Sequence, residues 1–326
     1  MKTLYLDCFC GASGDMMVGA LLDLGASFDA LREGLASLGV TGYTLSADKV
    51  NKKGLEATQF KVAVDPDAPQ PHRHLRHVLE IIEAGSLSAP VKEAAAATFR
   101  RIAEAEAAVH GSTVEKVHFH EVGAVDSIID VVGAHIALEL LGVERVLASP
   151  LPLGSGTIEC AHGIMPVPAP ATALLVKGVP AYGTDVEAEL VTPTGAALVT
   201  QLAEAYGPMP LMEIDAIGLG SGTRDLPDRA NVLRAFLGDT HDTPATEPIT
   251  VIESNLDDMT PELVAALAAD LIAAGARDAF VTPIVCKKGR PGHLITVLCD
   301  DERVPDVATL LFKGSTTFGV RMRHEH

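Results

Sequence analysis

The first residues of the chain show an apolar and polar pattern that predicts a strand, a loop and a helix. Residues 3–7 form a short apolar run that ends in a carboxylate, which suits a buried strand. Residues 8–14 contain two glycines and predict a loop. Asp15 then stands where a first-turn carboxylate would lie, before the apolar run 16–22. This order of elements is typical of an α/β fold.

Beyond this opening, the pattern predicts paired strands over 43–64 and a proline-rich break over 65–71. The further elements expected before residue 207 are a helix over 73–84, a helix over 90–110, a short strand over 117–121, a helix over 126–141 and a helix over 193–206. Residues 150–183 are rich in glycine and proline and are expected to be an ordered loop over the core. The first part of the chain is therefore predicted to be an α/β region.

The last part of the chain has a pattern of its own. Residues 237–247 contain Pro244 and several polar residues and are followed by Pro248, which favours a linker. The elements expected after it are a strand over 249–254, a helix over 260–274, strands over 279–285 and 294–299, a helix over 304–312 and a strand over 316–321. The order βαββαβ is the ferredoxin-like arrangement. We therefore expect a mixed α/β and α+β protein with domains 1–237 and 248–326.

Composition and charge exclude several classes of protein. The chain has 326 residues, of which 48% are apolar, so it can bury more than one core. No segment approaches the roughly 18 to 20 uncharged apolar residues of a membrane-spanning helix, and the N-terminus lacks the pattern of a signal peptide. The 43 acidic residues against 25 basic ones argue against nucleic acid or an anionic membrane as partner. Five scattered cysteines do not make a disulfide framework, so we expect a cytoplasmic protein with reduced thiols.

A cluster of histidines and carboxylates is the strongest candidate for chemistry. His118 and His120 would share one face of a strand, with Glu121 next to them. Asp126 and Asp130 would share one face of the helix that follows, one turn apart. Such nitrogen and oxygen ligands suit nickel, zinc, manganese or iron, and a base near neutral pH. Taken one at a time, the same residues would serve equally well as hydrogen-bonded core histidines and helix-capping aspartates.

A second group of histidines lies beside the proline-rich stretch. His72, His74 and His77 are close in sequence and next to two arginines, so we do not expect them to be deeply buried. Loosely held imidazoles suit transient capture of a metal ion, although a solvated helix start explains them as well. Cys8, Cys10 and Cys160 suit either a soft metal or burial as small apolar side chains.

Two further patterns point to anion binding. The segment 218–224 is rich in glycine, and Gly220, Gly222 and Arg224 could meet a phosphate through backbone N–H groups and a guanidinium, with tight turns as the alternative. The turn 287–292 carries the three cations Lys287, Lys288 and Arg290 in an otherwise acidic chain, which favours a nucleotide phosphate contact. The carboxylates Asp257 and Asp258 could hold a hard divalent ion near such phosphates, or they could cap the helix that follows.

Several stretches resemble the LarC family of nickel-insertion proteins, in the family's order and over nearly the whole chain. They are residues 4–25, 118–130, 162–172, 192–195, 218–234, 253–259 and 287–292. The resemblance implies an enzyme, a nickel insertase or cyclometallase of the lyase class, that acts late in synthesis of the nickel-pincer nucleotide cofactor of lactate racemase and related enzymes. Its substrate would be pyridinium-3,5-bisthiocarboxylate mononucleotide. Nickel would be placed between two sulfurs and a pyridinium carbon, while CTP is converted to CMP and diphosphate with Mn²⁺ or Mg²⁺.

Carried onto this sequence, the resemblance implies that Lys287, Lys288 and Arg290 meet CTP and that Asp257 and Asp258 meet its metal. The segment from His72 and the cluster at His118 and His120 become candidates for nickel delivery, and the glycine loops for the substrate phosphate. An apo-racemase that receives the cofactor and a homo-oligomeric state are also expected. Family members usually continue for several dozen residues beyond residue 321, so we expect a chain that is short at its C-terminal end, and its use of CTP on its own stays open.

Two other functions remain open on the sequence. A nickel carrier or storage protein would bind nickel without consuming CTP. A nucleotide-processing enzyme that depends on Mg²⁺ or Mn²⁺ would work without nickel and would tolerate the loss of His118 and His120.

Overall fold

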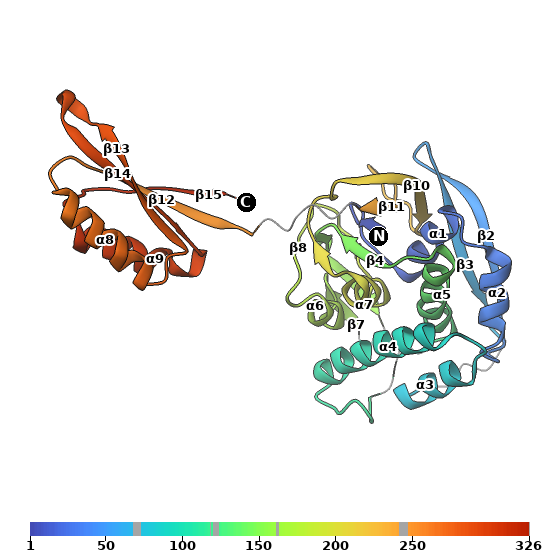
Figure 1. Ribbon diagram of the computed structural model, residues 1–326. Helices are drawn as coiled ribbons and strands as arrows, with labels where there is room; N and C mark the ends of the chain where they lie inside the picture. Colours follow the sequence, from blue (N-terminus) through green and yellow to red (C-terminus); the bar gives the residue numbers. More distant parts are fainter. Residues whose placement is uncertain (68–72, 118, 120–123, 161–162, 241–246, 326) are drawn as a thin grey trace. The chain divides into compact units, whose positions relative to one another are not determined.

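The computed structural model describes residues 1–67, 73–117, 119, 124–160, 163–240 and 247–325. The chain divides into two compact units, Met1–His241 and Asp242–His326, which are called unit 1 and unit 2 and are each described separately (Figure 1). None of the described helices is both long enough and apolar enough to cross a lipid bilayer.

Unit 1 is built on a mixed sheet whose described strands follow the order β2-β3-β10-β11-β1-β4-β9. These strands are β1 (Lys2–Asp7), β2 (Tyr43–Lys52), β3 (Leu55–Val64), β4 (Arg145–Ala148), β9 (Ala205–Tyr206), β10 (Met212–Ser221) and β11 (Val232–Thr240). The inner strand β1 runs antiparallel to β11 and parallel to β4, so the sheet combines a hairpin-type half with a βαβ-type half. Two small two-stranded sheets pair β5 (Leu151–Pro152) with β8 (Ala181–Tyr182) and β6 (Thr157–Cys160) with β7 (Gly163–Pro166).

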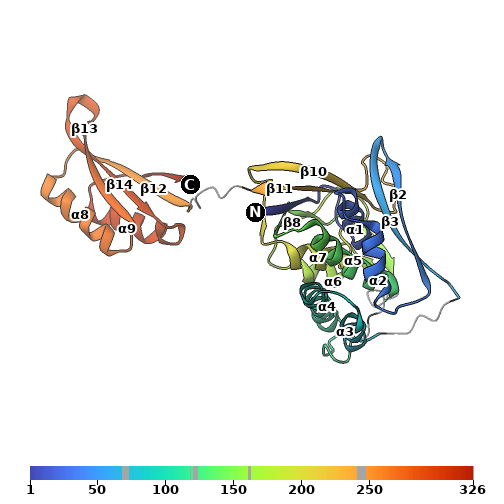
Figure 2. The ribbon, with the colours of Figure 1, turned by 45° about the vertical axis from the view of Figure 1, so that its right-hand side comes forward.

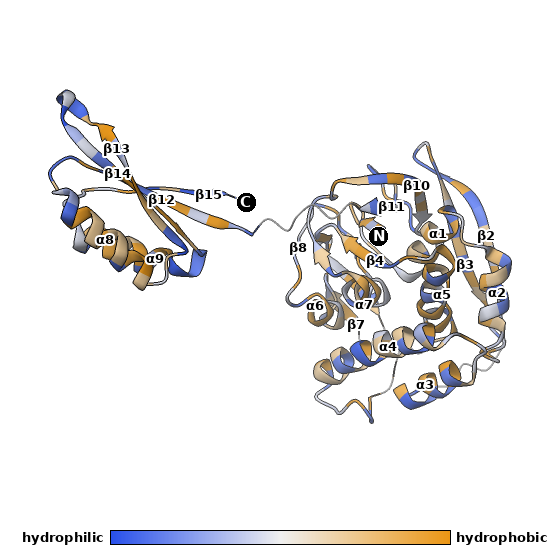
Figure 3. Cartoon of the chain, in the orientation of Figure 1, coloured by the Kyte–Doolittle hydropathy of each residue, from blue (hydrophilic) through white to orange (hydrophobic). Residues whose placement is uncertain are grey.

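The helices of unit 1 lie in two layers against one face of the sheet (Figure 2). They are α1 (Gly14–Asp23), α2 (Phe28–Ala36), α3 (Leu75–Ala84), α4 (Ala89–Val109), α5 (Val125–Leu141), α6 (Pro170–Leu175) and α7 (Pro193–Leu202). Helix α1 contacts β3, β10 and α5, whereas α4 contacts α3, α5, α6 and α7. Helix α5 is apolar on nearly every side because it lies between these layers, while Figure 3 shows hydrophilic stretches along α3 and α4.

Successive side chains of β1 point to opposite faces of the sheet, and they contribute to a separate core on each face. Leu4 and Leu6 belong to the main core beneath the helices. Tyr5 points to the other face, where it forms a small cluster with Leu147 and Phe236. Because this second cluster is small, nearly all of the apolar burial of unit 1 lies on the helical side of the sheet.

Unit 2 contains six main elements in the order βαββαβ. They are β12 (Ile249–Leu256), α8 (Pro261–Ala273), β13 (Asp278–Val285), β14 (Pro291–Cys299), α9 (Val304–Gly314) and β15 (Arg321–Glu325), with short 3-10 turns at Lys287–Gly289 and Asp301–Arg303. The strand order is β13-β14-β12-β15, with every neighbouring pair antiparallel. Both helices pack on the same core, which includes Ile252, Val264 and Val307.

Four expectations about element boundaries are wrong, of which three lie before the last strand. The described residues of the segment 150–183 form four short strands and a helix in place of a loop, because pairings such as β5 with β8 are made between distant segments. The helix expected over 193–206 ends at Leu202, and Ala205–Tyr206 pairs with β4. The segment expected as a linker from residue 237 begins later, since β11 continues to Thr240.

The last strand is also shifted from the expected range 316–321. Thr317 Oγ1 donates to Gly319 O at 2.8 Å, and this local turn competes with strand pairing. The strand β15 therefore begins only at Arg321. The strand expected over 117–121 falls largely outside the described residues; within it, Phe119 N–H donates to Arg73 O at 3.2 Å in an isolated bridge.

Candidate functional site

Three helices of unit 1 begin close to the loop that follows β1. Thr192, the N-cap of α7, donates its N–H to Ala12 O at 3.1 Å, and a methyl group on Gly195 would lie 2.1 Å from the same oxygen. A methyl group on Gly14, the first residue of α1, would lie 2.6 Å from Cβ of Asp130 in α5. The starts of α1, α5 and α7 therefore converge. Helix N-termini present free N–H groups and a partial positive charge, which favours an anionic ligand.

Three carboxylates share this place. Burial raises the pKa of Asp130 well above its usual value, and the charges of Asp15 and Asp126 raise it further. Burial is also the main reason that the pKa of Asp15 is raised, with a smaller contribution from Asp126, against the lowering effect of the Ser13 hydroxyl that donates to Asp15. Asp130 Oδ1 is buried and has no hydrogen-bond partner within the described residues. Buried carboxyl groups with raised pKa values are candidates for proton transfer.

A cavity of about 180 Å³ opens beside the start of α1. Its lining combines hydroxyl, amide, guanidinium and carboxyl groups, mainly from Ser13, Asp15, Glu189, Thr192, Arg224 and Asn231. Asn231 Nδ2 donates to Arg224 O at 3.0 Å and so fixes the turn that carries this arginine. The cavity therefore offers donors for an anionic or sugar-like group and, in Asp15, a proton acceptor.

The glycine-rich segment 218–224 has two roles: one part packs against a helix, and the other lines the cavity. Gly220 lies inside β10 with its Cα against α1, where a methyl group would lie 1.8 Å from Met16 O, so helix packing explains this glycine. Gly222 and Arg224 follow the strand and line the cavity. Of the three residues proposed from this segment, these two lie where a ligand phosphate could be bound.

The histidines of the proline-rich segment help to start α3. His74 is the N-cap of that helix, its Nδ1 lies 3.0 Å from Val117 O, and its N–H donates to His77 Nδ1 at 3.3 Å. A metal ion would have to compete with these contacts. His72 lies outside the described residues, and so do His118, His120 and Glu121. Over the ranges that the structure describes, no three His, Cys, Asp or Glu side chains are arranged to hold a metal ion.

In unit 2, the predicted acidic and basic turns lie side by side. Arg290 Nη1 lies 3.5 Å from Asp257 Oδ2, and a methyl group on Gly292 would lie 2.7 Å from Leu256 O. Thr316 Oγ1 donates to Asp258 Oδ1. Lys287 and Lys288 are exposed in the 3-10 turn between β13 and β14 and, within the described part of the chain, form no ion pair.

Sequence patterns did not single out every residue of the unit 1 site. Asp15 was expected only as a first-turn carboxylate, and Asn231 was not proposed for a ligand, whereas Ser13 lies in a glycine loop that was proposed for the substrate phosphate. The available signal was the position of Asp15 after a strand and a glycine loop, which is where parallel α/β folds often bind ligands. Its proximity to Asp130 depends on the packing of α1 against α5, which no local pattern records.

Nearly the whole chain matches proteins that are named for nickel insertion. The family model described as "Nickel insertion protein" matches residues 4–326. A relative from Geotalea daltonii that is named for nickel insertion is 50% identical over 323 residues, which are 98% of this chain and 82% of the relative. The pyridinium-3,5-bisthiocarboxylic acid mononucleotide nickel insertion protein of Geobacillus kaustophilus is 45% identical over 338 residues, 98% of this chain and 82% of that protein.

Among solved structures, one similar chain is the apo form of LarC2, the C-terminal domain of a cyclometallase involved in synthesis of the NPN cofactor of lactate racemase. It is 38% identical, with 24% of this chain and 55% of that chain covered and a TM-score of 0.24.

Proposed function

Because this chain belongs to the nickel insertion protein family, we propose that it inserts Ni²⁺ into pyridinium-3,5-bisthiocarboxylic acid mononucleotide, the substrate that the name of the Geobacillus relative states. The product would be the nickel-pincer nucleotide used by lactate racemase-type enzymes. The observation that supports this reaction most directly is the meeting of three helix starts with the Asp15, Asp126 and Asp130 carboxylates. The helix starts would bind the anionic mononucleotide there, and a carboxylate would accept the ring proton that must leave.

The insertion requires one proton transfer. Nickel held by the two thiocarboxylate sulfurs lies over a ring C–H bond. That bond breaks, its electron pair forms the carbon–nickel bond, and the proton passes to a base on the protein, so nickel remains in the +2 state. A base works best when its pKa lies near the operating pH. The raised pKa of the Asp15 carboxyl, which lines the cavity, suits this role.

The remaining groups of unit 1 have supporting roles in this proposal. The phosphate of the substrate would meet the helix starts, with Gly222, Arg224 and Thr192 beside it. The charge of Asp126 would help to keep the pKa values of Asp15 and Asp130 high, and Asp126 and Asp130 are also proposed nickel contacts. His118, His120 and Glu121 remain proposed catalytic groups, and His72, His74 and His77 proposed nickel-capturing groups. Gly220 would act by letting β10 approach α1.

For unit 2 we propose a ferredoxin-like fold that binds CTP. The order βαββαβ and the strand order β13-β14-β12-β15 support the fold assignment. Lys287, Lys288 and Arg290 would bind the phosphates of CTP. Asp257 and Asp258 supply oxygen donors that fit Mn²⁺ or Mg²⁺, and such an ion would neutralise the charge of the phosphates.

We expect the reaction to take place in the cytoplasm, in a homo-oligomer that delivers its product to an apo-racemase. All five cysteines are free thiols, which is compatible with a reducing compartment. The strong excess of acidic residues supports small molecules and metal as ligands over nucleic acid or membrane.

The decisive experiment measures two products in one mixture. Purified protein is incubated with the mononucleotide, Ni²⁺, Mn²⁺ and CTP, and the nickel-bound product and CMP are followed by mass spectrometry. We expect both to appear together. Product without CMP would overturn the use of CTP. Nickel binding with neither product would favour a carrier, and CMP formation that does not depend on nickel would favour a nucleotide-processing enzyme.

A further inference from the structure

A second cavity of unit 1 gathers side chains that the proposed insertion site does not use. It has a volume of about 250 Å³ and lies between the end of α4, the β6–β7 hairpin and the starts of α6 and α7. Its walls are apolar apart from one group of donors, which consists of Glu106, His110, Cys160, Met165 and Glu189. We call this cavity the sulfur pocket.

Two of the donors come from the last turn of α4. Glu106 and His110 are four residues apart on one helical face, with Glu106 Oε2 3.4 Å from His110 Nε2. Their side chains are 15% and 27% exposed, respectively. The C-terminal end of a helix carries a partial negative charge. The end of α4 and the Glu106 carboxylate therefore favour a cation on this side of the cavity.

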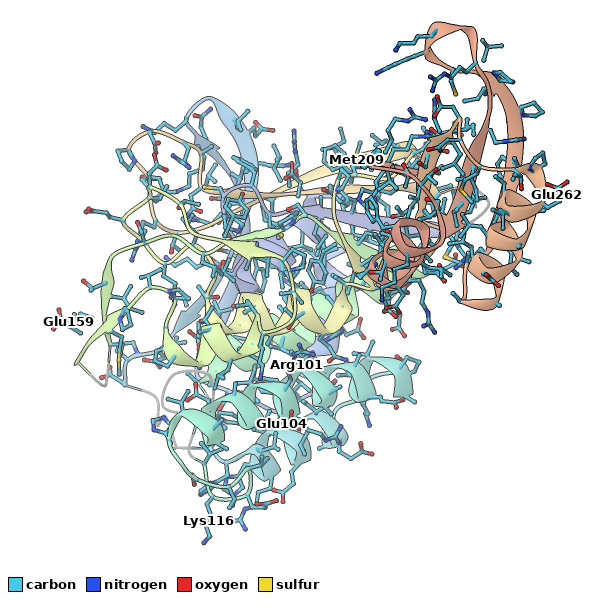
Figure 4. The ribbon with its side chains drawn as sticks, turned by 90° about the vertical axis from the view of Figure 1, so that its left-hand side faces the viewer. Arg101, Glu104, Lys116, Glu159, Met209 and Glu262 are labelled. Carbon is cyan, nitrogen blue, oxygen red and sulfur yellow. The ribbon has the colours of Figure 1, made fainter. Side chains whose placement is uncertain are left out.

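The sulfur donors come from the β6–β7 hairpin. Side chains alternate along a strand. Glu159 points away from the body of unit 1 in Figure 4 and is exposed, whereas its neighbour Cys160 is half-buried and lines the cavity. On the paired strand, Ile164 is exposed and Met165 lines the cavity. Cys160 Sγ lies 3.4 Å from Gly163 O, so the thiol is held at the end of the hairpin.

We propose that the sulfur pocket receives the Ni²⁺ ion before its insertion, with Cys160 and His110 as its principal ligands and Glu106 beside them. This inference rests on the proposed function. Thiolate, thioether and imidazole donors select borderline and soft metals and disfavour Mg²⁺, which prefers oxygen. Binding removes the proton from the Cys160 thiol as the nickel–sulfur bond forms, and release of the ion to the substrate returns a proton to that sulfur.

The position and openness of the sulfur pocket suit a cargo ion. Glu189 lines both this cavity and the cavity beside Asp15, so the two are adjacent. The described side chains do not already form a closed set of three ligands. In this proposal the ion completes the site when it binds between Cys160 and His110, and a site that is assembled by the ion also releases it more easily than a rigid site does.

The test uses the full chain and Ni²⁺ alone. Nickel is titrated while the thiolate-to-nickel charge-transfer absorption is recorded, and the affinity is measured by calorimetry. We expect Cys160→Ser to remove the absorption and His110→Gln to keep it. Both substitutions should lower the affinity for nickel about tenfold or more, since the loss of a residue that only hydrogen-bonds to a metal ligand already has an effect of this size. Cys286→Ser, which changes another half-buried thiol, in unit 2, is the matched control and should bind as the wild type does.

The outcomes separate this inference from the proposed function. Persistence of the absorption in Cys160→Ser, or its loss in Cys286→Ser, would overturn the sulfur pocket even if the wild type forms product. A wild type that shows the Cys160-dependent absorption but forms no product would overturn the proposed function and leave the pocket standing. Thermal unfolding midpoints of the three variants establish that each is folded.

Discussion

The candidate site residues of the two units differ in burial: unit 1 has two largely buried carboxyl groups, and unit 2 has exposed charges. In unit 1, Asp15 and Asp130 lie at the starts of packed helices, where burial raises the pKa of both. In unit 2, Lys287 and Lys288 project into solvent, and Arg290 and Asp257 form a largely exposed pair. Buried carboxyl groups suit proton transfer, because burial raises their pKa above the usual carboxylate range. Exposed cations suit reversible binding of a polyphosphate, which salt weakens.

The largest expected effect concerns the proposed base of unit 1. We expect Asp15→Asn to lower the rate of nickel-bound product formation by about a hundredfold or more, as loss of a general base does. Asp29→Asn is the matched control, because Asp29 is the exposed first-turn carboxylate of α2 and should leave the rate unchanged. Mass spectrometry of the product measures both. Near-normal turnover by Asp15→Asn would instead place the base among His118, His120 and Glu121.

The second prediction tests whether the glycine-rich segment serves packing at Gly220. A methyl group there would lie 1.8 Å from backbone Met16 O, so Gly220→Ala should destabilise the protein by about 1–3 kcal/mol through overpacking. Gly319→Ala, where no atom lies within 4 Å of the added methyl group, should change stability by less than about 0.5 kcal/mol. Denaturant unfolding measures both. A stable Gly220→Ala variant that has lost substrate affinity would show that this glycine contacts the ligand directly.

The third prediction concerns pH. Because the pKa of Asp130 is raised on folding, the folded chain holds this proton to a higher pH than the unfolded chain does. Stability should therefore fall as pH rises from the usual aspartate range through the folded pKa, by about 1.4 kcal/mol for each unit by which the pKa is raised. The measurement is the free energy of unfolding as a function of pH for the wild type and for Asp130→Asn. The difference between these two curves isolates the contribution of Asp130 from that of His135, whose pKa is lowered by burial to about 4. Parallel curves would show that Asp130 is an ordinary carboxylate.

The smallest expected effect belongs to the exposed charges of unit 2. Changing Lys287 and Lys288 together to alanine should weaken CTP binding about tenfold, and less at high salt, because exposed ion pairs are screened. Calorimetry with CTP and Mn²⁺ measures the affinity. Lys313→Ala, which removes an exposed cation from α9, provides the control. Equal affinities in all three proteins would count against nucleotide binding at this turn.

The sequence pattern predicted a large part of the fold. The strand–loop–helix opening, the long helices α4 and α5 and the order βαββαβ of the last segment all follow from the spacing of apolar residues. The resemblance to the LarC family is confirmed by the family model and by the relatives. Two of the errors, over 150–183 and at Ala205–Tyr206, lie where strands are only two to four residues long, because such strands are stabilised by a distant partner and have too few residues to show a period.

The candidate site was only partly predictable. The sequence by itself determined which residues can carry a charge, bind a metal or allow a close backbone approach, because these properties belong to the side chain. The tertiary structure alone decided that the start of α1 meets Asp130, that Gly220 faces α1, and that Cys160 and His110 line one cavity. Proximity and burial arise when distant segments pack together, and burial then sets the pKa on which the proposed chemistry depends.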